Sequence, residues 1–313
     1  MAFSRGLEDA LRSLDEAAGL LEAAAGRLRD AAEQLRRAAG DGPGGGGPGA
    51  PDALPGGYRG AASGEDPAAY VARHLAARWS REARDPIFTA GGVEIDLTTA
   101  HGKWQLLMLA VLKGARVREA VVYRTFAGLV ERGLDRLEKL AADSAFTREE
   151  LEEVLARRYR ALTRREAKVE ALVENAARLL REYGGDLDRL YAAAGGDSQA
   201  LVRALQEFKQ VGVTAHWLCR VLKHHGIWPG AGPEATRYFD RYTELPLQRL
   251  GLVAGGAGGG RGGGAAKFVD AYLGGDTLPL YRHGLFLCSR DDAALCRAEC
   301  PFHRLCTFPA RTE

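Results

Sequence analysis

The chain has 313 residues, of which 46% are hydrophobic and 27% charged, as is typical of a soluble protein with one or two domains. Its formal net charge of +2 is too small to indicate a nucleic-acid partner and too small to exclude one. No segment reaches the roughly 18 apolar residues that a membrane span needs, and the N-terminus lacks the apolar core of a secretory signal. We therefore expect a cytoplasmic protein without a membrane partner, in a compartment where disulfides are uncommon.

The first forty residues carry a heptad pattern. Leucine recurs every seven residues from Leu7 to Leu35, and a second seam position is filled by Leu11 and then by alanines up to Ala39. Such a seam is typical of a coiled coil and predicts a homo-oligomer, or a partner helix, through residues 1–40. The alternative is a single amphipathic helix that packs on the chain's own globular domain.

Residues 41–69 are rich in glycine and proline and predict a flexible linker. Helical periodicity dominates the rest of the chain, and Thr147 with Glu150 forms a capping-box pattern at the start of one helix. The only convincing strand covers 93–99, and a second glycine tract within 251–266 is expected to be a surface insertion. The fold class is therefore predicted to be all-α. The predicted helices cover 103–112, 117–140, 147–162 and 165–184.

Four of the five cysteines lie close together near the C-terminus, with the spacing C-x7-C-x3-C-x5-C. Thiolate ligands select zinc or iron–sulfur clusters, but structural zinc sites favour two C-x2-4-C pairs separated by a longer span. Three short gaps instead favour a [4Fe–4S] cluster; zinc, and thiols without metal or in disulfides, remain alternatives. The candidate ligands are Cys288, Cys296, Cys300 and Cys306.

Residues 204–226 have the pattern of two helices joined by a tight turn at Val211-Gly212-Val213. A turn of this kind points backbone N–H groups outward at the start of the second helix. Such groups bind a phosphate without reading base sequence. Two interpretations of this stretch are open: a hairpin that binds a phosphate, and an ordinary pair of packed helices.

The cysteine loop and the hairpin together resemble the endonuclease III family of helix-hairpin-helix DNA glycosylases, whose usual cysteine spacing is C-x6-C-x2-C-x5-C. His283-Gly284, shortly before the first cysteine, is similar to a His-Gly pair of that family. The resemblance implies a two-lobed all-α fold with a C-terminal [4Fe–4S] loop and double-stranded DNA in the groove between the lobes. The implied division is a hairpin lobe at 118–250 and a cluster lobe that joins 70–117 to 267–313.

The resemblance also implies site residues. Asp240, followed after eight residues by R-L-G-L, matches the family's aspartate, whose carboxylate stabilises positive charge on the sugar or helps activate the nucleophile, as in glycoside hydrolysis. Capping a helix is the alternative role of Asp240. The family's catalytic lysine falls on Thr214 or His216, and neither forms a Schiff base, so no β-lyase activity is expected. The implied DNA-binding residues are Val211, Gly212, Val213, Thr214 and Arg290.

The function implied is base excision repair at the nucleoid, by a monofunctional DNA glycosylase that flips a damaged or mismatched base out of the duplex. The alternative is a catalytically silent iron–sulfur protein that binds DNA or assembles through its N-terminal helix. Three departures from the family favour the alternative, and the first is the hairpin turn, where Gly212 is the only glycine and the family has L-P-G-V-G. Ala115 stands near the place of the family's gap-filling glutamine, and Asp291 and Asp292 follow Arg290 where the family has basic residues.

Overall fold

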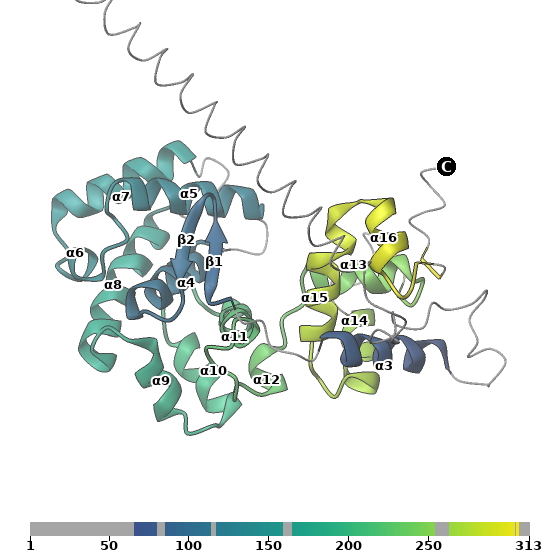
Figure 1. Cartoon of the computed structure of the whole chain (residues 1–313). Helices are drawn as coiled ribbons and strands as arrows, with labels where there is room; N and C mark the ends of the chain where they lie inside the picture. Colours follow the sequence, from purple (N-terminus) through teal and green to yellow (C-terminus); the bar gives the residue numbers. More distant parts are fainter. Residues whose placement is uncertain are drawn as a thin grey trace, which may run out of the picture. The chain divides into compact units, whose positions relative to one another are not determined.

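A computed structural model describes residues 66–79, 85–113, 117–158, 165–253, 263–303 and 305–306 (Figure 1). These residues form α-helices and a single two-stranded sheet, which confirms the all-α prediction. All of them belong to one compact unit, Leu54–Glu313. The predicted coiled coil, most of the predicted linker, Ala115 and most of the second glycine tract lie outside the described residues. Within the described ranges, no helix is both long and apolar enough to cross a membrane.

A first group of elements packs around one hydrophobic core. It is contiguous in the chain and contains the sheet and nine helices of the described residues. In chain order these elements are β1 (Ile87–Ala90), β2 (Val93–Asp96), α4 (Ala100–Leu112), α5 (Glu119–Glu131), α6 (Leu137–Ala141), α7 (Ala145–Arg158), α8 (Arg165–Tyr183), α9 (Leu187–Ala193), α10 (Ser198–Gln206), α11 (Thr214–His224) and α12 (Pro233–Thr236).

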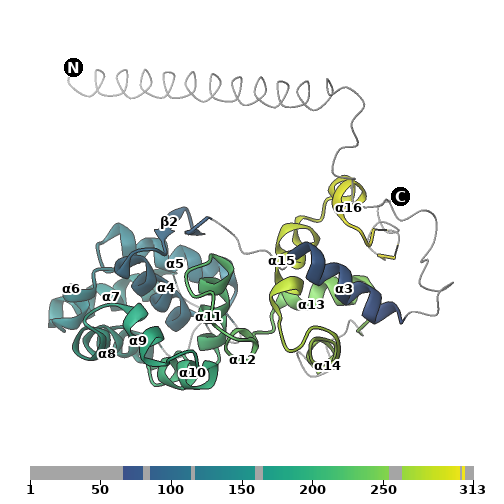
Figure 2. The same ribbon diagram turned by 60° about the horizontal axis from the view of Figure 1, so that its bottom comes forward.

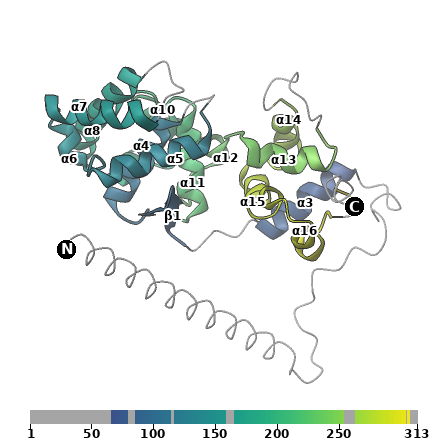
Figure 3. The same cartoon turned by 90° about the horizontal axis from the view of Figure 1, so that it is seen from above.

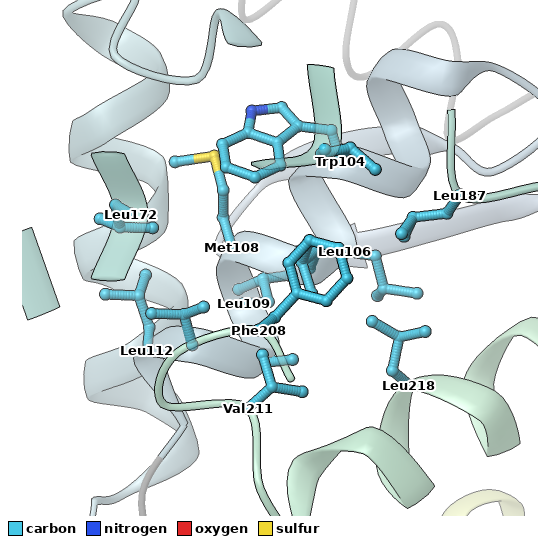
Figure 4. Close-up of a cluster of buried hydrophobic side chains, with 14 of the residues drawn as sticks. Trp104, Leu106, Met108, Leu109, Leu112, Leu172, Leu187, Phe208, Val211 and Leu218 are labelled. Carbon is cyan, nitrogen blue, oxygen red and sulfur yellow. The ribbon is translucent and has the colours of Figure 1, made fainter. Parts of the chain in front are cut away.

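Helix α4 is the centre of this core. All its residues from 102 to 112 are buried, as expected of a helix that is apolar on every side. Trp104 also satisfies its single polar group inside the core, because its indole N–H donates to the carbonyl of Asp135 at 2.9 Å. Figure 4 shows Trp104 and Met108 of α4 with Phe208 and Leu218, which come from a segment a hundred residues away.

The sheet is a β-hairpin whose second strand overlaps the predicted strand at 93–99. The first strand was not predicted. The two strands are joined by Gly91 and Gly92, which have φ angles of 63° and 85°, as a two-residue hairpin turn requires. A Cβ atom on Gly91 would lie 2.5 Å from the carbonyl oxygen of Tyr123, so glycine also lets the turn contact α5.

Two predicted helix boundaries need correction. The predicted helix at 117–140 is two helices, α5 and α6, because the chain turns at Gly133 with a φ of 62°. The capping box at Thr147 and Glu150 is also wrong. Helix α7 begins at Ala145, and the hydroxyl of Ser144 accepts the backbone N–H of Thr147 at 3.1 Å.

A second group of elements has a separate core. It combines α3, from the start of the described chain, with four helices and a short 3-10 helix from its end, and Figures 2 and 3 show α3 lying along α15. The implied division differs from this one, because α4 is buried in the first core and only α3 joins the C-terminal helices. These elements are α3 (Pro67–Trp79), α13 (Arg241–Arg249), α14 (Gly263–Tyr272), α15 (Leu278–Phe286), η1 (Cys288–Arg290) and α16 (Ala293–Glu299).

Helices α13 and α15 share the most extensive contact of the second group. Pro246 lies inside α13 and has no N–H, so the carbonyl of Tyr242 cannot accept the usual helical hydrogen bond. Gly284 of α15 lies against this carbonyl, and a Cβ atom there would be 1.8 Å from the oxygen. The absence of a side chain at Gly284 therefore permits the packing, which gives the glycine of the His-Gly pair a structural role.

Candidate functional site

The predicted hairpin is formed by α10, a turn at 207–213 and α11. Gln210 and Gly212 both have positive φ angles, 61° and 37°. Phe208 and Val211 point into the first core and hold the turn in place (Figure 4), whereas the side chain of Val213 is 64% exposed. The turn therefore presents its backbone and Val213 to solvent on a firmly packed base.

The backbone N–H groups of Gly212 and Val213 take no part in the hydrogen bonds of the turn. Among the described residues neither has an acceptor, while the next N–H, that of Thr214, donates to the carbonyl of Val211 at 2.7 Å. A cavity of about 590 Å³ lies beside this turn, and Lys113 and Lys168 line it with residues 206–214. Unpaired N–H groups at the start of a helix are suited to an anion.

Two of the expected DNA-binding side chains are buried. Val211 is part of the core, and Thr214, at 5% exposure, donates its hydroxyl to the carbonyl of Ala110 at 2.9 Å. His216, the other candidate for the lysine position, lies with its Nδ1 atom 3.0 Å from the carbonyl oxygen of Glu234. Of the hairpin residues singled out from the sequence, only Gly212 and Val213 remain for contact with a phosphate.

Two lysines near the turn differ in their environment. Burial lowers the pKa of Lys168 to about 8, and its amine donates to the carbonyl of Val111 at the end of α4. Lys209 is exposed, and its amine lies between Glu170 at 3.0 Å and Glu174 at 2.6 Å. Lys209 is therefore neutralised by two carboxylates of α8, whereas Lys168 faces the cavity from a buried position.

Asp240 is the N-cap of α13, so its alternative role is confirmed. Its Oδ1 atom accepts the backbone N–H groups of Tyr242 at 3.0 Å and Thr243 at 3.2 Å. The Thr243 hydroxyl accepts the N–H of Asp240 at 2.8 Å, which completes a capping box. A cap of this type stabilises a helix by about 1 kcal/mol.

The second oxygen of Asp240 is held by Arg220, a residue that the sequence analysis did not single out. The Arg220 side chain is fully buried on α11, and its Nη2 atom lies 2.5 Å from Asp240 Oδ2. Its Nη1 atom donates to the carbonyl of Tyr238 at 2.7 Å, and its guanidinium lies 3.9 Å from the centre of the Tyr281 ring. The sequence does contain a signal for Arg220, which is an arginine on the apolar face of an amphipathic helix. A buried guanidinium there needs a partner of opposite charge.

Glu119 is a second carboxylate that the sequence analysis missed. Its Oε1 atom accepts from Lys113 at 3.2 Å and from the Tyr123 hydroxyl at 2.7 Å, and its Oε2 atom accepts from the Tyr242 hydroxyl at 2.9 Å. Burial raises the pKa of Glu119, but the Lys113 charge and the two hydroxyl groups outweigh burial and leave this pKa below its usual value. Glu119 therefore joins α5 of the first core to α13 of the second.

The four clustered cysteines are free thiols in the second group of elements, which excludes disulfides among them in this structure. Burial raises the pKa of the Cys288 and Cys300 thiols to about 12. Every pair among the four cysteines interacts electrostatically, so the four sulfur atoms share one neighbourhood. Within the described ranges, no three His, Cys, Asp or Glu side chains converge tightly enough for a single metal ion.

The two aspartates between the first two cysteines have structural partners. Asp291, with a φ of 52°, forms an ion pair with Arg249 at the end of α13. Asp292 is the N-cap of α16 and accepts the N–H groups of Ala294 at 2.8 Å and of Leu295 at 3.0 Å. Among the described ion pairs, neither aspartate pairs with Arg290, which is exposed at the end of η1.

The chemistry of this site fits an iron–sulfur cluster. Four thiols lie within one short stretch of chain, and the Arg249 charge opposes the burial that raises the pKa of Cys288 and Cys296, as suits a group that carries net negative charge. The Cys300 sulfur has two nearby donors, the backbone N–H of Phe302 and the ring of His283. Searches against family models, curated proteins and solved structures find no match to this chain.

Proposed function

We propose that this chain binds double-stranded DNA in the cytoplasm, at the nucleoid, and acts in base excision repair as a monofunctional DNA glycosylase. The observation that carries the proposal is the pair of backbone N–H groups at Gly212 and Val213 that have no acceptor among the described residues, on a hairpin in the same folded unit as four clustered thiols. The resemblance of both features to the endonuclease III family supports it.

The hairpin would bind one backbone phosphate. The N–H groups at the start of α11 supply two donors, and the helix dipole adds partial positive charge. Such contacts fix the position of a protein on the duplex without reading its sequence. Arg290, exposed beside the cysteine loop, is proposed as a second contact with the DNA backbone.

Asp240 would act on the sugar of the extruded nucleotide. Arg220 and the cap of α13 fix the direction of its carboxylate. As the bond between base and sugar breaks, its electron pair leaves with the base, and the carboxylate stabilises the positive charge that develops on the sugar. A water oxygen then bonds to the sugar carbon, and the proton that it loses passes to the departed base. Because Thr214 and His216 stand where the family has a lysine, no imine forms and the DNA strand is not cut.

Cys288, Cys296, Cys300 and Cys306 would hold a [4Fe–4S] cluster. When bound, the cluster supplies four further bonds that tie η1, α16 and the C-terminal loop together. The residues of the chain provide the rest: Phe302 and His283 donate toward Cys300, and Arg249 places positive charge beside two of the thiolates. No chemical step of base release passes through the cluster.

A second candidate function is favoured by the contacts of Asp240. Both of its carboxylate oxygens already accept hydrogen bonds from the protein, so the residue fulfils a structural role without any substrate. A catalytically silent protein that binds DNA through the same hairpin would need nothing more from Asp240. The two candidates share the hairpin and the cluster and differ only in base release.

The decisive experiment is a panel of duplexes that each contain one damaged or mismatched base, treated with the parent chain and with Asp240→Asn. Asparagine preserves the helix cap but removes the negative charge. Asp197→Asn is the control for the change of a capping aspartate alone, because Asp197 caps α10 through the N–H groups of Gln199 and Ala200 and has no buried cationic partner among the described residues. We expect base release by the parent and by D197N, and a loss of at least a hundredfold in D240N. DNA binding without base release from any lesion would refute the glycosylase and leave the silent binder.

A further inference from the structure

His283 connects α3 to the cysteine loop. Its side chain is 1% exposed on α15. Its Nδ1 atom lies 3.2 Å from the indole nitrogen of Trp79, at the end of α3, and its Nε2 atom lies 3.5 Å from the sulfur of Cys300. Two hundred residues of sequence separate Trp79 from the ring that it contacts, so this arrangement is invisible in the sequence.

The identity of the neighbours fixes which ring nitrogen carries the proton. The indole N–H of Trp79 can only donate, so the Nδ1 atom of His283 must accept and cannot itself be protonated. The proton of the neutral ring is then on Nε2. Because Nε2 is the atom that faces Cys300, the ring donates an N–H···S hydrogen bond to that sulfur.

Two neighbours of Trp79, Phe286 and Arg78, hold its indole in position. The indole of Trp79 stacks on Phe286 with ring centres 5.7 Å apart and an angle of 20° between the planes. The guanidinium of Arg78 lies 5.0 Å from the centre of the Trp79 ring and donates to the carbonyl of Glu299 at 2.5 Å. Glu299 immediately precedes Cys300. The end of α3 therefore reaches the cysteine loop through Arg78, in addition to its contact with His283 through Trp79.

We propose that His283 sets the reduction potential of the iron–sulfur cluster by donating a hydrogen bond to its Cys300 ligand, with Trp79 as the positioning residue that fixes the donor nitrogen. The inference rests on the proposed cluster. A donor to a cysteine sulfur stabilises the more negative, reduced state of a cluster more than the oxidised state, and hydrogen bonds to the sulfurs are among the factors that set cluster potentials. The donor therefore raises the potential.

The test is a redox titration of the full chain, purified without oxygen, for the parent and three variants. His283→Phe keeps a ring in the buried space but removes the donor. We expect about a tenfold change in the reduction equilibrium, equivalent to a midpoint lower by about 59 mV for one electron. Trp79→Phe leaves His283 in place but frees its tautomer, and we expect a smaller shift in the same direction.

The matched control is His303→Phe, in the same loop. The Nδ1 atom of His303 lies 3.2 Å from the carbonyl oxygen of Cys300 and not against its sulfur, so we expect the parent midpoint. Equal midpoints for H283F and the parent, or equal shifts in H283F and H303F, would overturn the role of His283. If H283F loses its cluster, W79F decides, and an unchanged midpoint in W79F overturns the proposal. A parent without iron and sulfide overturns the proposed cluster, and this inference with it.

Discussion

Replacing Arg220 with methionine tests whether the buried pair with Asp240 is a coupled unit. Arg220→Met keeps an unbranched side chain in the core but leaves Asp240 without its cationic partner. Breaking a buried ion pair on one side costs about 3 to 5 kcal/mol, and we expect the lower end of this range, because the Asp240 side chain is 21% exposed. The guanidinium also lies 3.9 Å from the Tyr281 ring centre, and because both groups are buried, losing that contact adds about 2 kcal/mol.

Asp240→Asn breaks the same pair from the other side and leaves a fully buried guanidinium, so we expect it to cost about 3 to 5 kcal/mol as well. The double variant removes both charges and should be at least about 2 kcal/mol more stable than the sum of the single effects predicts.

Urea unfolding measures these free energies when far-UV circular dichroism and tryptophan fluorescence give coincident transitions. The iron content of the four proteins should be matched, since a bound cofactor stabilises the folded state. Single effects that add to within about 0.5 kcal/mol would refute the coupling. In that case Asp240 would be held by the cap alone.

Three further predictions concern other parts of the chain. Glu119→Gln should lower the melting temperature above pH 4.5, and this effect should disappear at lower pH. The reason is that the folded-state pKa of Glu119 lies below its usual 4.5, so the stabilisation by its carboxylate is lost as the pH falls through the folded-state pKa. A difference in melting temperature that does not depend on pH would contradict this. Val213→Glu should weaken duplex binding at least tenfold, because it places a carboxylate beside the backbone N–H groups of the turn. Phe146→Glu, also at an exposed site, should leave the affinity unchanged. Equal affinities of the two variants, measured by fluorescence anisotropy, would argue against DNA binding by the hairpin. Deleting residues 1–40 should reduce the mass measured by light scattering to that of a monomer, and an unchanged mass would rule out the coiled coil.

The parts of the fold that could be predicted are those that local pattern determines. The apolar run of α4 indicated a buried helix because no polar face interrupts it. The first strand was missed because four residues are too few for alternation to be visible, and the signal was the Gly91-Gly92 turn beside it. Helix α5 ends just before Gly133, although the apolar periodicity continues past this residue. The positive φ of Gly133 cannot continue a right-handed helix, whatever the apolar pattern.

The candidate site divides in the same way. The residue type and spacing of the cysteines are local, and they brought four thiols into one neighbourhood. The partners of Asp291 and His283 are not local, because Arg249 is 42 residues and Trp79 204 residues away in the chain. From the sequence, Asp291 could be compared only with its neighbours in the loop, such as Arg290. The fold places Arg249 against it instead.

The position of α3 has a consequence for the synthesis of the protein. Helix α3 leaves the ribosome before every element of the first core, yet its apolar residues pack against helices from the other end of the described chain. The first core, contiguous in sequence, can fold while synthesis continues. Leu75 and its neighbours must then stay exposed until α13–α16 emerge. A nascent chain whose synthesis stops once the first core has emerged would therefore carry a folded first core and an unpaired apolar helix, the kind of surface that chaperones bind.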